Sequence, residues 1–389
     1  MKKIFLFSVL VFLTIQSQAQ EGLHTRIHHQ YQSQRALGMG DAFVAVANDY
    51  AALFYNPAGL ARRQDGQINM SLELLGAKSF ADFAKDLDNA SKTQGNDQAK
   101  YDAYSSFLKQ NYGKTFMLRT GLFEGIWVRP GWGFGILPAD VTVEYKIHDN
   151  VAPAINARVY ADSTIAYGYG RDLKGLVPGR LSWGTTAKFV NRGYFNRQVS
   201  AWDLVGDSKV VKDTDLREGY TADFDLGLLY TPELPSDGIW YTFKLAKPTF
   251  GAVVRNTLDY GFGQSLKLLN KNKTEAPERL YRVLDLGMKF EYPSMWIFGG
   301  RGALDIRDIG HPNFSSRKAL HAGLEFDWTV SNWWKGSYRF GVNQGYPTFG
   351  VSALLFMFNL DFVTYGEDVG TYDSPKENRM YAVKLNIDI

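Results

Sequence analysis

The sequence has no cysteine among its 389 residues. Disulfide bonds, thiolate metal sites and lipid attachment to an N-terminal cysteine are excluded, because each needs a thiol. Long apolar runs are also missing: after residue 19 no stretch reaches the roughly 18 apolar residues of a membrane-spanning helix, which excludes a helical membrane protein. The formal net charge is only +3. No basic field points toward nucleic acid, so no nucleic-acid partner is expected.

Residues 1–19 carry the pattern of an export signal. Lys2 and Lys3 precede an apolar core at 4–15, and Ser17-Gln18-Ala19 places small residues around a cleavage position. This arrangement is typical of a secretory signal peptide and is too short for a spanning helix. We expect cleavage after Ala19. An exported protein without disulfides must be stabilised by a large core or by a closed barrel.

Beyond residue 66, apolar and polar residues alternate with a period of two. Alternation over about ten or more residues predicts long strands with one apolar face. Strands of soluble sheets average about five or six residues, so this length favours strands that cross a bilayer, which need roughly 9–11 residues. The last strand shows the pattern, with one face formed by Tyr381, Val383, Leu385, Ile387 and Ile389.

These segments predict an all-β fold, a transmembrane antiparallel β-barrel of about 14 strands, an even number as in bacterial outer-membrane barrels. We expect short turns at 129–131, 292–294 and 331–332, where proline, glycine, serine and asparagine gather. Aromatic residues recur near the strand ends, as at a membrane boundary, although a soluble sandwich rich in aromatics would look similar. The predicted strands are 67–78, 115–127, 132–147, 157–171, 180–195, 217–231, 248–262, 279–292, 296–308, 318–331, 336–345, 348–357, 360–367 and 379–389.

The segment 35–61 departs from the strand pattern. It contains Gly38-x-Gly40-x-Ala42-Phe43 and Ala47-Asn48-Asp49-Tyr50-Ala51-Ala52, and it ends in Tyr55-Asn56-Pro57-Ala58-Gly59-Leu60. Asn48 or Asp49 is suited to cap a short helix through Phe54, and Pro57 disfavours helical backbone at Asn56.

These motifs resemble the N-terminal region of the FadL-type outer-membrane transporter superfamily. The chain is most similar to the TraF-like and PorV-like branch of that superfamily, because 218–232, 250–256 and 339–350 also resemble it. The resemblance implies a short helical plug inside the barrel, whose movement opens the passage, with Asn56, Pro57, Ala58 and Gly59 as the plug motif. The alternative is that these residues only fix the turn of the plug.

Two further stretches interrupt the strand rhythm. Within 79–113, apolar residues at helical spacing predict two short amphipathic helices in the first extracellular loop. They form either a cap on the barrel rim or, as the resemblance implies, a surface that collects hydrophobic substrate. In the strand 132–147, the apolar face changes from even to odd positions around Pro138, which predicts a β-bulge or kink. Either the strand leaves the membrane there or the wall has a gap, and the resemblance implies the gap, a lateral opening at Pro138.

The sequence gives no pattern for catalysis, for a cofactor or for a metal. His24 and His28 are four residues apart, but no nearby carboxylate completes a metal site. Pairings of His321 with Glu325 or Asp327, and of His148 with Asp149, arise readily by chance in a charged lumen or loop. We therefore expect no enzyme, no cofactor and no metal site.

The alternation predicts an outer-membrane barrel, and the resemblance implies that it admits small hydrophobic, fatty-acid-like molecules through a plugged lumen. Its expected parts are the signal peptide 1–19, a periplasmic or plug segment 20–66, and the barrel 67–389 with the helical extracellular loop 79–113. The expected partners are outer-membrane lipid and lipopolysaccharide, a small hydrophobic substrate and the barrel-assembly machinery, with the chain as a monomer. The alternative is a non-transport barrel, TraF-like or PorV-like, that serves as a surface scaffold or as a partner of a secretion- or conjugation-type envelope machine.

Overall fold

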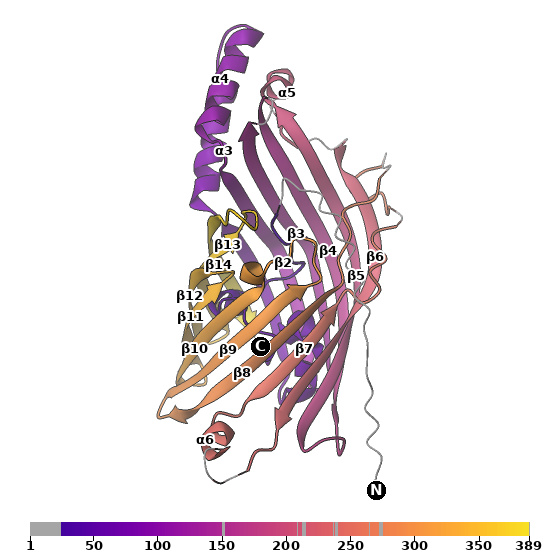
Figure 1. Cartoon of the computed structure of the whole chain (residues 1–389), viewed down its shortest axis with the longest axis vertical. Coiled ribbons are helices and arrows are strands. Elements are labelled where there is room, and N and C mark those ends of the chain that lie inside the picture. The colour runs from indigo at the N-terminus through magenta and orange to yellow at the C-terminus, as the bar shows by residue number, and fades with distance from the viewer. Residues whose placement is uncertain are drawn as a thin grey trace.

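Fourteen antiparallel strands close into one barrel, in which each strand pairs with the next along the chain and β14 pairs with β1 (Figure 1). The computed structural model describes residues 25–149, 152–207, 209–211, 215–235, 237, 240–263, 265–271 and 275–388. The expected signal peptide lies outside these residues. The barrel and its strand number are those that the alternation predicts.

The strands are β1 (Gln67–Gly76), β2 (Thr115–Arg129), β3 (Trp132–Asp149), β4 (Pro153–Leu173), β5 (Gly179–Ser200), β6 (Arg217–Pro232), β7 (Thr249–Arg255), β8 (Val283–Met295), β9 (Phe298–Ile309), β10 (Leu320–Ser331), β11 (Trp334–Asn343), β12 (Tyr346–Leu355), β13 (Phe358–Asp368) and β14 (Glu377–Asp388). The helices are α1 (Gln34–Gly38), α2 (Ala52–Tyr55), the 3₁₀ helix η1 (Pro57–Arg62), α3 (Lys78–Ser91), α4 (Asp97–Gln110), α5 (Ala201–Gly206), α6 (Trp240–Leu245) and α7 (Ser316–Ala319).

The alternation separates an apolar outer face from a polar inner face. In β1, Leu72 and Leu74 are 57% and 61% exposed, whereas the intervening Ser71 and Glu73 are buried. The same arrangement holds in β14, where Val383 and Leu385 are exposed and Lys384 is buried. An outer belt of large apolar side chains on a closed barrel is the surface that a bilayer covers, and closure leaves no strand edge in the hydrocarbon.

The strands differ in length around the barrel. β4 and β5 have 21 and 22 residues, whereas β11 and β12 have 10 each. The long strands extend beyond the others at the end where α3 and α4 lie (Figure 1). There, Phe83 and Phe107 of these helices form a buried apolar cluster with side chains of β2 to β5, among them Phe116 and Ile155. The two predicted amphipathic helices are therefore present, and they pack on extended strands. Within the described residues, no helix is long and apolar enough to cross a membrane.

Three of the predictions around β7 and β8 are wrong. The strand predicted at 248–262 ends at Arg255, because Asn256 and Asp259 have positive φ angles of 51° and 54°, a left-handed backbone that breaks a strand. The chain rejoins the sheet at Val283 rather than at 279. The turn predicted at 292–294 lies inside β8, and the chain turns instead at Trp296, where φ is 56°.

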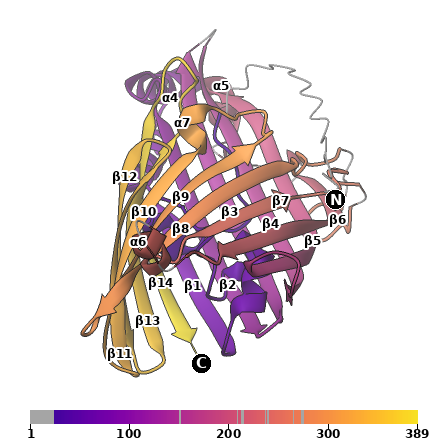
Figure 2. The same cartoon turned by 60° about the horizontal axis from the view of Figure 1, so that its bottom comes forward.

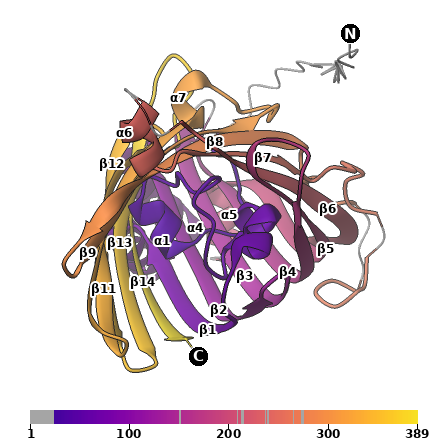
Figure 3. The same ribbon diagram turned by 90° about the horizontal axis from the view of Figure 1, so that it is seen from below.

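A plug formed by α1, α2 and η1 lies inside the barrel at the end opposite to α3 and α4, as the view along the barrel shows (Figure 3). That end is called the plug end here, and the opposite one the far end. Figure 2 shows the barrel tilted, with the plug end turned forward. Leu37, Phe43 and Leu53 of the plug are fully buried. The lumen at the plug end is therefore filled by the chain's own N-terminal residues.

Candidate functional site

The plug backbone contacts a series of glycines in the barrel wall. A Cβ atom added at Gly184 of β5 would lie 2.3 Å from the backbone of Pro57, and one at Gly323 of β10 would lie 2.1 Å from the oxygen of Met39. Real Cβ atoms do not come so close to backbone atoms. The plug backbone therefore approaches these strands more closely than any residue other than glycine would allow. Inward-facing glycines of this kind occur on several strands around the plug: Gly170, Gly184, Gly227, Gly251, Gly323 and Gly341.

The Asn56–Gly59 motif joins two turns of the plug to strand β6. Asn56 has an extended backbone (φ −156°, ψ 103°), as the following proline requires, and its side-chain oxygen accepts from Ala58 N at 3.1 Å. Its side-chain amide donates to the oxygens of Val44 (2.9 Å) and Leu228 (3.1 Å). Pro57 opens η1, Ala58 is fully buried, and Gly59 lies where a Cβ would meet the oxygen of Ala47 at 2.0 Å. These contacts fix the turn, and the expected role of the motif in plug movement stays a prediction.

Buried ion pairs anchor the plug to the wall. Arg35 of α1 donates from Nε and Nη2 to both oxygens of Glu325 in β10, at 2.8 and 2.7 Å, and from Nη1 to Asp49 at 2.8 Å. Burial lowers the pKa of Arg35, but Glu325 and Asp49 outweigh burial and raise this pKa well above its ordinary value. The Arg35 guanidinium therefore stays charged, and it holds α1 to the wall across the lumen.

A second anchor lies around Asp41. Its carboxylate pairs with Arg307 of β9 and accepts from the hydroxyl of Tyr55 at 2.6 Å. Burial raises the pKa of Asp41, but the opposing charge of Arg307 outweighs burial and lowers it below its ordinary value. Asp305 of β9 accepts from the backbone N–H groups of Phe43 and Val44 at 2.6 and 2.8 Å. The plug is thus bonded to strands on more than one side of the barrel.

The chain that precedes the plug runs through the lumen from the far end. Arg26 pairs with Glu367 of β13 at 2.5 Å. His28 stacks on Tyr160, with ring centroids 3.9 Å apart, and its Nε2 lies 3.2 Å from Asp162. Burial lowers the pKa of His28 well below its ordinary value. Asp162 raises this pKa, but the charge of Arg192 acts with burial to lower it. His28 is therefore neutral at physiological pH.

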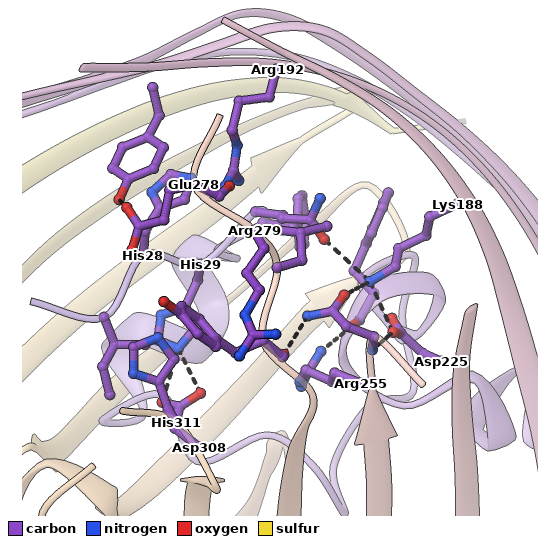
Figure 4. Close-up of a pocket in the computed structure, with 18 of the residues that line it drawn as sticks. His28, His29, Lys188, Arg192, Asp225, Arg255, Glu278, Arg279, Asp308 and His311 are labelled. Carbon is purple, nitrogen blue, oxygen red and sulfur yellow. Dashed lines mark hydrogen bonds and ion pairs between the residues drawn. The ribbon is translucent and has the colours of Figure 1, made fainter. Parts of the chain in front are cut away.

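A polar chamber of about 70 Å³ lies between this N-terminal segment and the strap-like chain that links β7 to β8 (Figure 4). His29 lies 3.0 Å from Asp308 on one side of it, and Lys188 pairs with Asp225 at 2.8 Å on another. Burial lowers the pKa of His311, beside Asp308, to about 4. Two aromatic side chains of the plug region, Tyr31 and Phe54, also line the chamber and stack with centroids 4.5 Å apart.

The wall is irregular where the sequence predicts a slip around Pro138. Between Leu137 and Asp140, β3 has one more residue than β4 opposite it, and β2 has one more than β1 between Glu124 and Gly121. The pairing of β2 with β3 covers 115–121 and 125–129 of β2 and is interrupted between these ranges. Two bulges therefore lie side by side. Whether they form a lateral opening stays a prediction.

The plug presents apolar side chains to this irregular patch. Leu137 points inward and is 3% exposed, and it shares one buried apolar cluster with Leu53, Phe54 and Tyr31. On the outer face of the barrel, Phe134 and Ile136 are 36% and 38% exposed. Apolar groups thus lie on both sides of the wall at the bulges.

The structure tests one of the histidine pairings considered from the sequence. His321 Nδ1 lies 2.9 Å from the oxygen of Gly40, while arginines occupy the oxygens of Glu325, so the two do not form the pair considered from the sequence. His24 and the side chain of Asp149 lie outside the described residues. Among the residues that are described, no group of three or more His, Cys, Asp and Glu has the geometry of a metal site.

Sequence reasoning does not single out the residues that anchor the plug, such as Arg35, Asp41, Arg307 and Glu325. The available signal is weak: Arg307 and Glu325 are charged residues at inward positions of apolar strands. That pattern indicates that the two side chains face the lumen, but it does not predict which residues they contact.

No protein-family model and no curated protein matches the sequence. Solved structures similar to the chain include a TodX deltaS2S3 mutant monoaromatic hydrocarbon channel, with 12% identity and a TM-score of 0.46, covering 92% of this chain and 97% of that one. The Ralstonia pickettii toluene transporter TbuX has 9% identity and a TM-score of 0.43, over 92% of this chain and 98% of that one. A Pseudomonas aeruginosa FadL homologue has 8% identity and a TM-score of 0.35, over 93% and 98%. The barrel assignment rests on this chain's own strand pairing.

Proposed function

We propose that this barrel lies in the outer membrane and admits small hydrophobic molecules, which enter from the far end and leave sideways into the bilayer at the bulges beside Pro138. The plug end then faces the periplasm, and α3 and α4 lie outside the cell. In this proposal, residues 1–19 are an export signal, the barrel-assembly machinery inserts the chain, and the chain acts as a monomer in lipid and lipopolysaccharide.

The observation that carries the proposal is the apolar contact between plug and wall at the bulges. The chamber is lined mainly by charged and polar groups, which disfavour an apolar solute. Tyr31 and Phe54 are part of that lining and also of the buried cluster that reaches Leu137. Apolar side chains therefore pack against one another from the chamber to the interrupted β2–β3 pairing, and an apolar solute that displaces them stays in apolar surroundings.

Lateral exit removes the need to move the plug. Passage along the barrel axis requires that the ion pairs of Arg35 and Asp41 break, and breaking one buried pair costs about 3–5 kcal/mol. Passage through the wall needs only that the bulged stretch separate locally, where the strand ladder is already interrupted. The Asn56–Gly59 motif then serves to keep the plug seated during passage.

Closing the bulges tests this proposal. Deleting Phe123 and Ala139 together with Pro138→Ile restores one-to-one pairing of β1 with β2 and of β3 with β4 while β2 and β3 stay in register. Pro138→Ala is the matched control, because it keeps both extra residues. Uptake of N-phenyl-1-naphthylamine, a small apolar fluorophore, is followed in cells of a Gram-negative host whose lipopolysaccharide excludes it. We expect the closed variant to lose uptake and the control to keep it. Normal uptake by an assembled closed variant contradicts lateral exit.

The second candidate is the non-transport role of a TraF-like or PorV-like scaffold. The firm seating of the plug favours it, since a barrel filled by bonded side chains also suits a static platform. Stoichiometric co-purification with an envelope complex, together with wild-type uptake no greater than that of cells lacking the protein, would support this alternative.

A further inference from the structure

Strand β7 closes only part of the wall beside β6. β6 pairs with β5 along its whole length, but with β7 only from Leu226 to Tyr230. Beside the remaining part of β6, residues 217–225, lies the chain between β7 and β8. Its described residues, 256–263, 265–271 and 275–282, are called the strap. Among them, two direct backbone bonds reach β6: Thr257 N to the oxygen of Phe224 (3.0 Å) and Gly263 N to that of Tyr220 (3.2 Å).

Three carboxylates of β6 hold most of the strap. Asp225 accepts from Asn256 N at 2.9 Å, and Asp223 accepts from the backbone N–H groups of 258 and 259 at 2.9 and 3.2 Å. Glu218 accepts from the backbone N–H groups of 268, 269 and 270 at 3.0 Å each. Because these bonds use side chains, the strap can leave β6 while the ladder between β6 and β5 stays intact.

The chamber behind the strap is too small for an aromatic hydrocarbon. Its volume is about 70 Å³, whereas an engineered apolar cavity that binds benzene has about 150 Å³. A wall of the chamber must therefore move before such a solute enters. The N-terminal segment is held by buried ion pairs and the strands by their ladders. The strap is held by the side-chain acceptors of β6 and by bonds of Glu278 to Tyr160 (2.5 Å) and Arg192 (3.0 Å). Its movement breaks these bonds but no pairing between two strands.

Apolar side chains frame the strap on both of its sides. On the inside, Phe262 and Leu280 are 7% and 6% exposed and form a buried cluster with Val190 of β5. On the outside, Tyr260 and Leu268 are 77% and 73% exposed. An apolar solute that meets the outer side chains can replace the inner ones against Val190 when the strap moves.

The strap also lies where an open edge is tolerable. β6 has 16 residues, and roughly 9–11 residues span the hydrocarbon. Counted from Pro232 at the plug end, the hydrocarbon ends near residue 222. By this count, residues 217–221 of β6 lie outside the hydrocarbon, where water can satisfy the backbone groups that a departing strap exposes.

We propose that the strap is a movable section of the barrel wall, which swings away from β6 and opens a side window for a small apolar solute to enter the chamber. The inference rests on the proposed function, for which it supplies the entrance, and this entrance is separate from the exit at the bulges of β2 and β3.

The first test measures opening without transport. The native chain has no cysteine, so Ile27→Cys introduces one thiol into the chamber lining, at a side chain 5% exposed. We expect slow labelling by N-ethylmaleimide in cells, and labelling several-fold faster after Glu218→Gln, because an amide NH₂ cannot accept the strap's N–H bonds. Glu233→Gln, the same change at an exposed residue of the plug end, is the matched control. Equal labelling in all three proteins contradicts the window.

The second test joins the window to uptake. Phe224→Cys with Thr257→Cys, bridged by a thiol-cleavable bis-maleimide, ties the strap to β6. Leu228→Cys with Ala252→Cys, bridged alike, ties a pair that already lies face to face on β6 and β7. We expect the first bridge to abolish N-phenyl-1-naphthylamine uptake, cleavage to restore it, and the second bridge to have no effect. Undiminished uptake with the strap tied overturns the inference. If wild-type uptake is absent while Glu218→Gln still speeds labelling, the proposed function fails and the window stands.

Discussion

Replacing Glu325 by glutamine should loosen the plug without opening the barrel. The Glu325 carboxylate is 1% exposed and accepts from Arg35 at 2.8 and 2.7 Å, from Arg301 at 2.8 Å and from Arg339 at 2.9 Å. Removing one partner of a buried ion pair costs about 3–5 kcal/mol. Each arginine keeps a second carboxylate, namely Asp49, Asp327 or Asp361, so we expect the lower end of that range.

A loss of about 3 kcal/mol raises the population of detached plug roughly a hundredfold, since each 1.4 kcal/mol is a factor of about ten. Trypsin cuts after Arg62 and Arg63, and when opening is fast the cleavage rate follows the open population. We therefore expect Glu325→Gln, in outer-membrane fragments with the plug end accessible, to be cut about a hundred times faster than the wild type. Arg35→Gln added to Glu325→Gln should not increase the rate further, because no uncompensated Arg35 charge remains.

Two observations keep this prediction open to refutation. The heat-dependent gel mobility of the folded barrel should be unchanged in Glu325→Gln, which separates a loose plug from a misassembled barrel. If the assembled variant is cut less than about tenfold faster, a change below about 1.4 kcal/mol, then the Glu325 ion pairs do not hold the plug, and the account of its seating is wrong.

Three further outcomes follow from the same contacts. Gly184→Ala puts a Cβ 2.3 Å from the plug backbone, so we expect the free energy of unfolding to fall by about 1–3 kcal/mol, measured as a lower unfolding temperature in detergent. Gly206→Ala, which has open space around it, should match the wild type. Burial lowers the pKa of His28 in the folded chain, so the N-terminal segment binds more protons when it is detached from the lumen. We therefore expect this segment to be fully bound above about pH 6.5 and to detach increasingly as the pH falls below that value. A spin label at Ile27→Cys should gain mobility below about pH 6.5, and His28→Gln should remove this pH dependence. Leu385→Arg puts a charge on the lipid face of β14, at a cost of roughly 2–4 kcal/mol near the midplane, and should reduce the amount of assembled barrel in the outer membrane; an unchanged amount would place Leu385 away from lipid.

The barrel can be predicted from the sequence because its determinant is local. In β14, apolar Val383 and Leu385 alternate with polar Lys384 and Asn386, and a bilayer outside a polar lumen requires that period of two. The slip at Pro138 is visible for the same reason, since a bulge shifts the alternation from even to odd positions. Features that depend on neighbouring residues along the chain, such as strands and bulges, can therefore be predicted from the sequence.

The strap escapes prediction because its residues keep the alternation of a strand. Leu258, Tyr260 and Phe262 stand at every second position, yet Asn256 turns left-handed and Phe262 is buried in the lumen rather than on a sheet face. The plug anchors are invisible for another reason. Arg35 and Glu325 are 290 positions apart, and only closure of the barrel brings them together.

The central claim is that an apolar solute passes along the plug to the wall beside Pro138. Photolabelling with a small apolar diazirine, followed by mass spectrometry, tests it most directly. Lipid-borne reagent reaches the outward side chains Phe134 and Ile136 in any membrane barrel, so the informative positions are the inward ones, Phe54 and Leu137. We expect label on both side chains, reduced by an excess of unlabelled toluene and lost when the strap is tied to β6. Label confined to outward side chains would contradict it.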